Sequence, residues 1–70
     1  MKIGELAKQS GLSAHTLRFY EKQGLISPST RSESNYRIYN QNDLSTAKFI
    51  KRSRDMGFSL EEVEVFLSIR

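Results

Sequence analysis

"SGLSAHTLRFYEKQGL", residues 10–25, decides the fold of this chain, because it reads as a tight turn followed by a short helix. Gly11 is expected to stop a preceding helix in a left-handed or turn conformation. Ser13 is a good N-cap for the next helix, which Gly24 stops after about Gln23. Two short helices joined by a glycine-containing turn are the helix-turn-helix motif.

The helices on both sides of this turn have apolar positions at helical spacing. Ile3, Leu6 and Ala7 follow the i, i+3, i+4 pattern, which predicts a helix over residues 3–9. In the second helix Leu17 is expected to face inward. The two helices therefore have apolar side chains with which to form a shared core.

Arg18, Phe19 and Tyr20 are three consecutive large side chains on the second helix. Because neighbouring residues diverge by about 100° around a helix, Leu17 and both aromatic rings cannot all face one core. At least one ring is expected at the boundary beside Arg18, where a guanidinium fork and a phenol suit phosphate contact. The alternative is that the rings are core and Arg18 is merely solvated.

A hairpin is predicted next, with its loop at Ser32–Asn35 and its second arm in "YRIYN", residues 36–40. After a helix-turn-helix, this hairpin suggests a wing in which Arg37 and Tyr39 hold the sugar-phosphate backbone. A half-buried edge strand with Ile38 inward is an equal alternative for each residue taken alone.

Two further helices are predicted after the hairpin. Asn40 is expected to cap the third helix, which Gly57 ends. Ser59 with Glu62 forms a capping box for the fourth helix, which runs from about Leu60. The inner face of the third helix is predicted to hold Leu44, Ala47, Ile50 and Met56.

The sequence "KRSR", residues 51–54, closes the third helix. Cations there favour the negative end of the helix dipole, so a solvated face is a strong interpretation. A second phosphate clamp is the rival. No stop signal accompanies Ile69 and Arg70 at the end of the fourth helix, so we expect the 70 residues to be a fragment of a longer protein.

Composition excludes several classes of protein. Seventy residues make one domain. With no cysteine and one histidine, the chain has neither a disulfide framework nor a zinc-ligand cluster. It has no apolar run of membrane-spanning length, and its first residues lack the apolar region of a signal peptide, so a cytoplasmic location is expected. Eleven Lys and Arg against eight Asp and Glu, a net charge of +3, are a weak indication of an anionic partner.

Catalysis has little support in the sequence. No Ser/His/Asp arrangement, glycine-rich phosphate loop or pair of acids in an apolar setting is evident. The chain is therefore predicted not to be an enzyme.

Four motifs together resemble the MerR family of bacterial transcription regulators. They are "IGELAK" (3–8), "TLRFYE" (16–21), "YRIY" (36–39) and "GFSL" (57–60), and the resemblance covers nearly the whole chain. The final "GFSLEEVEVFLSIR" (57–70) is especially similar to the zinc- and copper-responsive, metal-sensing branch. Each motif is weak alone, but the set is specific.

The resemblance implies a mainly α winged helix-turn-helix DNA-binding domain over residues 1–70, with four helices and a small β-hairpin wing. It implies a nucleoid-associated regulator that binds double-stranded promoter DNA as a homodimer. The dimer distorts the spacer in response to an effector and acts on RNA polymerase indirectly. The dimerisation helix and effector domain lie outside the fragment. No cofactor is expected in the fragment, whereas the full-length protein is expected to bind a metal ion or another effector.

The candidate contact residues lie on the second helix, in the wing and at the end of the third helix. The family commonly has tyrosine where this chain has Phe19, which leaves an apolar contact there. The residues expected to contact DNA are Ser13, His15, Thr16, Arg18, Phe19, Tyr20, Lys22, Arg31, Tyr36, Arg37, Tyr39, Lys51 and Arg54.

Two other functions remain open. An excisionase-like architectural protein has the same winged motif without an effector. A small protein-interaction module would instead use the apolar side chains of the fourth helix, Phe66, Leu67 and Ile69, to dock a partner.

Overall fold

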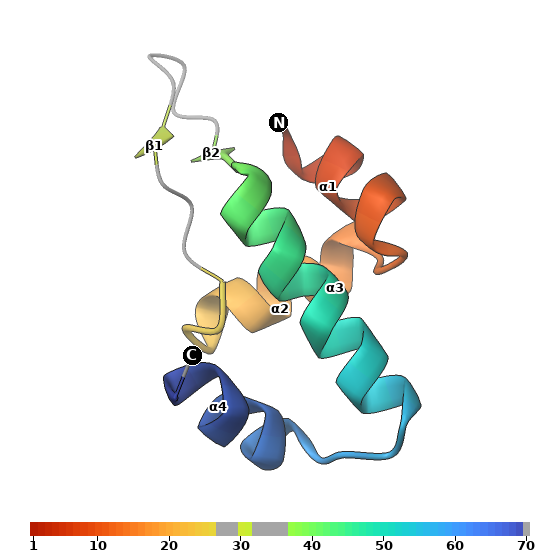
Figure 1. The fold of residues 1–70 in the computed structure, drawn as a ribbon. Helices are drawn as coiled ribbons and strands as arrows, with labels where there is room; N and C mark the ends of the chain where they lie inside the picture. Colours follow the sequence, from red (N-terminus) through yellow and green to blue (C-terminus); the bar gives the residue numbers. More distant parts are fainter. Residues whose placement is uncertain (27–29, 32–36, 70) are drawn as a thin grey trace.

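The computed structural model is mainly helical, as predicted (Figure 1). It describes residues 1–26, 30–31 and 37–69, and only the backbone at residues 30, 31 and 37. The elements in this part of the chain are α1 (Ile3–Ser10), α2 (Ala14–Lys22), β1 (Thr30–Arg31), β2 (Arg37–Ile38), α3 (Gln41–Asp55) and α4 (Leu60–Ser68).

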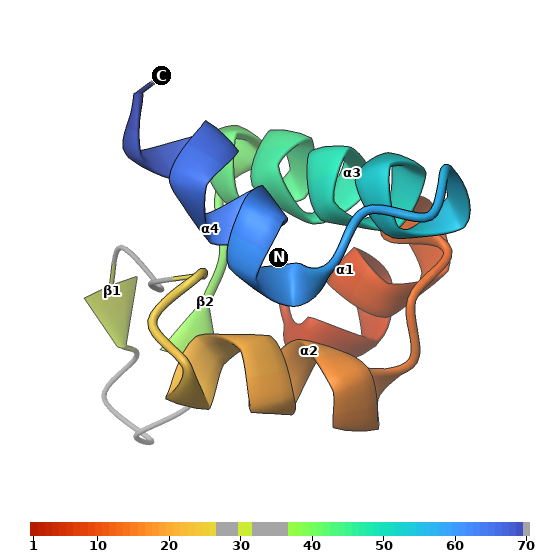
Figure 2. The ribbon, with the colours of Figure 1, turned by 90° about the horizontal axis from the view of Figure 1, so that it is seen from below.

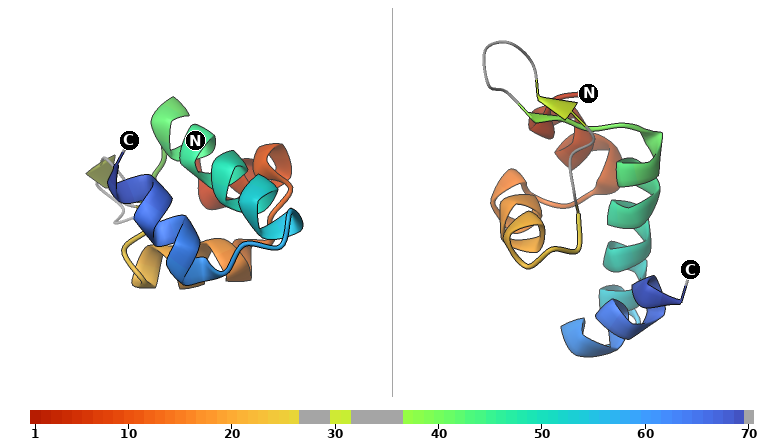
Figure 3. Two further views of the ribbon diagram at one scale, coloured as in Figure 1. Left: turned by 60° about the horizontal axis from the view of Figure 1, so that its bottom comes forward. Right: turned by 90° about the vertical axis from the view of Figure 1, so that its left-hand side faces the viewer.

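The helices pack so that α2 has one side open. α1 packs against both α2 and α3, and α4 packs against α3. Figure 2 shows α2 along one side of the molecule, with the strands beyond one end and the α3–α4 connection beyond the other. Figure 3, in its right-hand view, shows the strands near the start of α3 and α4 near its end. Among the described helices, none has both the length and the apolar character needed to cross a bilayer.

The connection between α1 and α2 is built as the sequence predicts. Gly11 adopts a left-handed conformation with φ of 80°, and its N–H donates to the Ala7 carbonyl at 3.0 Å. Ser13 then caps α2 by accepting the N–H of Thr16 at 3.1 Å. A Cβ atom at Gly11 would meet the Lys51 side chain at 2.9 Å, so both the backbone and the neighbouring helix favour glycine.

Every helix contributes to the core. The largest fully buried side chains are Leu6 of α1, Leu17 of α2, Ile50 of α3 and Val63 of α4. The prediction that Met56 joins them is wrong, because Met56 is 64% exposed. It lies about 240° around the helix from Ile50, away from the inner face. The rest of the core consists of Tyr20, Ile26, Tyr39, Leu44 and Ala47.

Tyr39 joins three parts of the chain. Its side chain is 2% exposed, and its hydroxyl donates to Oε2 of Glu21 on α2 at 2.5 Å. Its backbone N–H donates to the Met1 carbonyl, just before α1, at 2.8 Å. The Tyr39 side chain is thus engaged within the protein, and its hold on a DNA backbone stays a prediction. β2 ends at Ile38, so the side-chain alternation of a strand does not extend to Tyr39.

Both later helices begin with a capping box. The Asp43 N–H donates to the Asn40 side chain and the Asn40 N–H donates to the Asp43 carboxylate, each at 2.9 Å. Ser59 and Glu62 form the same reciprocal pair at the start of α4, as predicted. Hydrogen bonds from the backbone and then the side chain of Ser59 lower the pKa of the Glu62 carboxyl. This cap is therefore complete at neutral pH and weakens as the pH falls through that lowered pKa.

The two strands pair antiparallel, with Arg31 opposite Arg37. They are the described part of the expected hairpin. Residues 32–36, which include the predicted loop and Tyr36, lie outside the described residues, as do the side chains of Arg31 and Arg37. The role of the hairpin as a wing that contacts DNA stays a prediction.

Replacing Gly11 with alanine is expected to destabilise the chain by about 1–2 kcal/mol, because a left-handed conformation is strained for an L-residue. Thermal or denaturant unfolding measures this loss. Gly24→Ala is a matched control, since Gly24 has φ of 84° and nothing within 4 Å of its added Cβ. A larger loss at Gly11 than at Gly24 isolates the contact with Lys51. A Gly11→Ala chain as stable as the original would contradict the left-handed conformation of this turn.

Gly4→Ala, within α1, is expected to stabilise the chain by about 0.5–1 kcal/mol, because alanine loses less conformational entropy than glycine in a helix.

Replacing Tyr39 with phenylalanine is expected to lower the free energy of unfolding by about 1–2 kcal/mol, because it removes a donor from a half-buried carboxylate. Denaturant unfolding should compare Tyr39→Phe alone, Glu21→Ala alone and the two combined, because alanine removes the acceptor. The double-mutant cycle isolates the energy of this one hydrogen bond. A cycle in which the two losses simply add would contradict the bond.

Candidate nucleic-acid interface

One face of α2 is a row of exposed side chains. His15, Arg18, Phe19 and Lys22 are all exposed and follow the i, i+3, i+4, i+7 spacing of a single helix face. Phe19 is 47% exposed despite its apolar ring. The row contains two permanent positive charges and no acid, so it presents donors and an aromatic surface to the solvent.

The opposite face of α2 is core. Leu17 is 1% exposed and Tyr20 is 7% exposed. The two adjacent aromatic rings therefore separate, with Phe19 outside beside Arg18 and Tyr20 inside, and their centroids lie 5.9 Å apart. This confirms that one ring lies at the boundary. Tyr20 lies inside because its position on the helix returns it to the side of Leu17, and its contact with DNA stays a prediction.

A hollow of about 230 Å³ opens beside the first turns of α2. There Arg54 donates from Nη1 to the Phe58 carbonyl at 2.9 Å, which holds the connection between α3 and α4. This bond places a guanidinium next to the N-terminal end of the exposed row. Leu60 at the rim was not anticipated from the sequence, because only the packing of α4 brings it to α2. The hollow is lined by His15, Thr16, Phe19, Tyr20, Arg54 and Leu60.

The hydroxyl groups at the start of α2 are engaged with each other. Ser13 Oγ donates to Thr16 Oγ1 at 2.8 Å and accepts the Thr16 N–H at 3.1 Å. Ser13 is exposed and Thr16 is half-buried. Their observed role is to cap the helix that carries the row.

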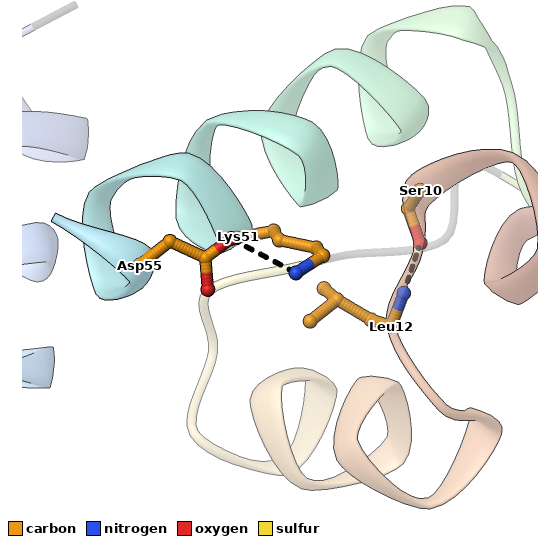
Figure 4. Close-up of polar contacts among 4 residues, drawn as sticks. All are labelled: Ser10, Leu12, Lys51 and Asp55. Carbon is orange, nitrogen blue, oxygen red and sulfur yellow. Dashed lines mark hydrogen bonds and ion pairs between the residues drawn. The ribbon is translucent and has the colours of Figure 1, made fainter.

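The cations of "KRSR" do not form one cluster. Lys51 donates from Nζ to Asp55 Oδ2 at 2.9 Å. Figure 4 shows the Lys51 side chain extending towards the turn that contains Leu12. Arg52 is exposed and lies about 160° around the helix axis from Arg54. Arg54 alone of these cations lines the hollow beside α2. Arg52 and Arg54 thus lie on different sides of α3, and a second phosphate clamp at Arg54 stays a prediction.

The structure describes the side chains of ten of the thirteen predicted contact residues, all except Arg31, Tyr36 and Arg37. Lys51 lies apart from the row on α2, and Tyr20 and Tyr39 are buried. The sequence analysis did not predict the role of Glu21, whose carboxylate accepts a hydrogen bond from the Tyr39 hydroxyl. The feature that could have indicated it is a carboxylate beside the inner face of a helix, where a buried acceptor requires a donor. The structure brings together the predicted residues His15, Thr16, Arg18, Phe19, Lys22 and Arg54.

Charges are unevenly distributed over the described residues. Glu61, Glu62 and Glu64 are exposed on α4, whereas the exposed row of α2 carries only cations and neutral groups. Within the ranges that the structure describes, no group of three His, Asp or Glu side chains could hold a metal ion. An arrangement of fixed cationic donors without acids suits a polyanion, because each contact with a phosphate releases bound counterions.

Comparison with known proteins identifies the family. The family model described as "MerR HTH family regulatory protein" matches residues 1–68. "Heavy metal-dependent transcription regulator 2" of Rhizobium meliloti strain 1021 is 49% identical over 69 residues, which are 99% of this chain and 47% of that relative. The "HTH-type transcriptional regulator ZntR" of Escherichia coli K12 is 45% identical over 69 residues, 99% of this chain and 49% of that relative. The chain spans about half the length of these curated relatives.

Solved structures agree with this assignment. The transcription regulator PbrR691 from Ralstonia metallidurans CH34, in complex with lead(II), has a TM-score of 0.90 and 40% identity, covering 100% of this chain and 55% of that chain. HiNmlR, a MerR family regulator lacking the sensor domain and bound to promoter DNA, has a TM-score of 0.89 and 30% identity, covering 99% of this chain and 52% of that chain. The four packed helices, the glycine turn before α2 and these matches together show that the chain belongs to the MerR HTH family of regulatory proteins.

Proposed function

We propose that residues 1–70 are the DNA-binding domain of a transcription regulator, with α2 as the helix that enters the major groove. The observation that carries the proposal is the exposed row on α2, because Leu17 and Tyr20 fix the opposite face in the core. A relative of the same fold, HiNmlR, is bound to promoter DNA in its solved structure, which supports the choice of DNA over other polyanions.

The proposed contacts divide into two kinds. Arg18, Lys22 and Arg54 offer charged donors to phosphates, which position the protein without reading sequence. His15 and Thr16 lie in the first turns of α2, the part of a recognition helix that reaches base edges. Specificity is therefore expected to depend on the N-terminal half of α2 and affinity on the cations around it.

The hairpin is proposed as a wing flanking the groove helix. Arg31, Tyr36 and Arg37 remain its candidate contacts. The pairing of Tyr39 with Glu21 supports a fixed base for the wing, since it joins the residue after β2 to α2. A phosphate contact from the wing would thereby be coupled to the placement of the recognition helix.

The regulator is proposed to act as a homodimer that distorts the promoter spacer when an effector binds, and to affect RNA polymerase through the DNA. Bending or untwisting a site costs about 1–10 kcal/mol, which contacts to phosphates offset. The relatives named as heavy-metal-dependent regulators support a metal ion as the effector. The 70 residues contain no cysteine and one histidine, so metal sensing is not assigned to them.

A non-enzymatic role in the cytoplasm, in association with the nucleoid, follows from this proposal. The relatives are named as transcription regulators, in agreement with it. The excisionase-like architectural alternative shares the same DNA-binding surface and differs only in having no effector.

A protein-interaction module is the second candidate, because Val65 and Ile69 are 59% and 78% exposed near the end of α4. Titration of the 70-residue chain with a short DNA duplex, followed by backbone amide shifts, separates the two. We expect shifts at residues 15–22 and a dissociation constant of about 10⁻⁴–10⁻⁶ M, the range of non-specific binding. Shifts confined to α4 would favour the interaction module.

Replacing Arg18 with alanine is expected to weaken DNA binding by about 1–3 kcal/mol, because a charged donor to the duplex is lost. Fluorescence anisotropy at two salt concentrations measures the change in affinity and in salt dependence. Arg52→Ala is the matched control, since it removes the same charge from an exposed site that does not line the hollow beside α2. That variant is expected to change affinity by no more than about 0.5 kcal/mol, because salt screens distant charges.

Equal losses in the folded Arg18→Ala and Arg52→Ala chains would show that only net charge matters, and would remove α2 as the groove helix. Unfolding curves for both variants confirm that neither loss comes from misfolding.

A further inference from the structure

Phe19 is the member of the exposed row that phosphate binding does not explain. Its ring has no hydrogen-bond donor, yet it is 47% exposed on the same face as Arg18 and Lys22. A benzyl side chain can neither bind a phosphate nor match the donors and acceptors of a base edge. It can offer apolar surface, and the apolar group that DNA presents in the major groove is the C5-methyl of thymine.

The surroundings of Phe19 suit a methyl group. It lines the 230 Å³ hollow together with Thr16, one turn earlier on α2, and Leu60 of α4. Both neighbours carry methyl groups and both are half-buried. The hollow is also lined by His15, Tyr20 and Arg54. An apolar group that entered it against Phe19, Thr16 and Leu60 would lose its contact with water against three side chains at once, whereas Arg54 suits a phosphate.

The side of α2 from which Phe19 projects is also fixed. Tyr20, the adjacent residue, is buried and its ring lies 5.9 Å from that of Phe19, centroid to centroid, at an angle of 54°. Because the core fixes Tyr20 and therefore the rotation of α2, Phe19 must point outward whether or not DNA is bound. An apolar side chain that is already in position on a recognition helix loses little conformational entropy on binding, which favours a specific contact over non-specific binding.

We infer that Phe19 makes the chain sensitive to the C5-methyl group of thymine, and that it thereby selects thymine at one position of the binding site. The inference rests on the proposed DNA-binding function and adds to it a base preference that the cationic side chains cannot supply. Removal of that methyl from the DNA is expected to weaken binding about four-fold, the equivalent of about 0.8 kcal/mol for one buried methyl group.

Two duplexes test the inference with the 70-residue chain: one of alternating adenine and thymine, and one of alternating adenine and uracil, which lacks every C5-methyl. The original chain is expected to bind the uracil duplex about four-fold more weakly. Phe19→Ala is expected to bind both duplexes equally, because the methyl has lost its partner, and Phe19→Leu is expected to keep part of the difference. Comparing variants on the same pair of duplexes cancels any effect of the methyl on DNA shape.

A direct readout is a nuclear Overhauser effect between the Phe19 ring protons and a thymine methyl. Equal binding of the two duplexes by the original chain would overturn the inference while leaving DNA binding intact. A four-fold difference that persists in Phe19→Ala would also overturn it, since another residue would then read the methyl. Failure of the original chain to bind either duplex would instead remove the proposed function. Because Phe19 is exposed, unfolding curves are expected to show that both variants remain folded.

Discussion

Burial of Leu17 and Tyr20 fixes the rotation of α2 about its own axis, and every feature of the candidate interface depends on that orientation. These two side chains pack in one core with Leu6 and Ile50. A helix packed in this way exposes a fixed set of side chains, because the residues between the core positions must face outward. The cationic and aromatic row on α2 is thus a consequence of core packing, and it is in place before any partner arrives.

Local signals determined most of what could be predicted from the sequence. Gly11, Ser13, Asn40 and Ser59 each act within four residues of their own position, and each has the predicted role in the structure. Tyr39 could not be placed in the same way. Its burial depends on Glu21 and Met1, which are distant in sequence, and on the end of β2 at Ile38. The alternation rule that suggested an outward Tyr39 holds only while a strand continues.

The candidate site was predicted in part for the same reason. The 100° spacing showed that Leu17, Phe19 and Tyr20 could not all be core, and with α1 packed against α2 it is Phe19 that lies outside. Helix geometry separates Arg52 from Arg54 by about 160°, whereas Lys51 and Arg54, three residues apart, differ only in their partners, Asp55 and the Phe58 carbonyl. The contacts expected from Arg31, Tyr36 and Arg37 stay predictions, because these side chains lie outside the described residues.

Arg54 shows how one side chain can serve both stability and recognition. A guanidinium carries five N–H donors in a rigid plane, and the bond to the Phe58 carbonyl uses one of them. The same group can therefore brace the α3–α4 connection and hold an anion simultaneously. A lysine in its place would concentrate its charge on a single ammonium at the end of a flexible stem. A single ammonium could then either hydrogen-bond the Phe58 carbonyl or bind an anion. Arg54→Lys, usually regarded as a conservative substitution, would therefore loosen the α3–α4 connection whenever an anion is bound.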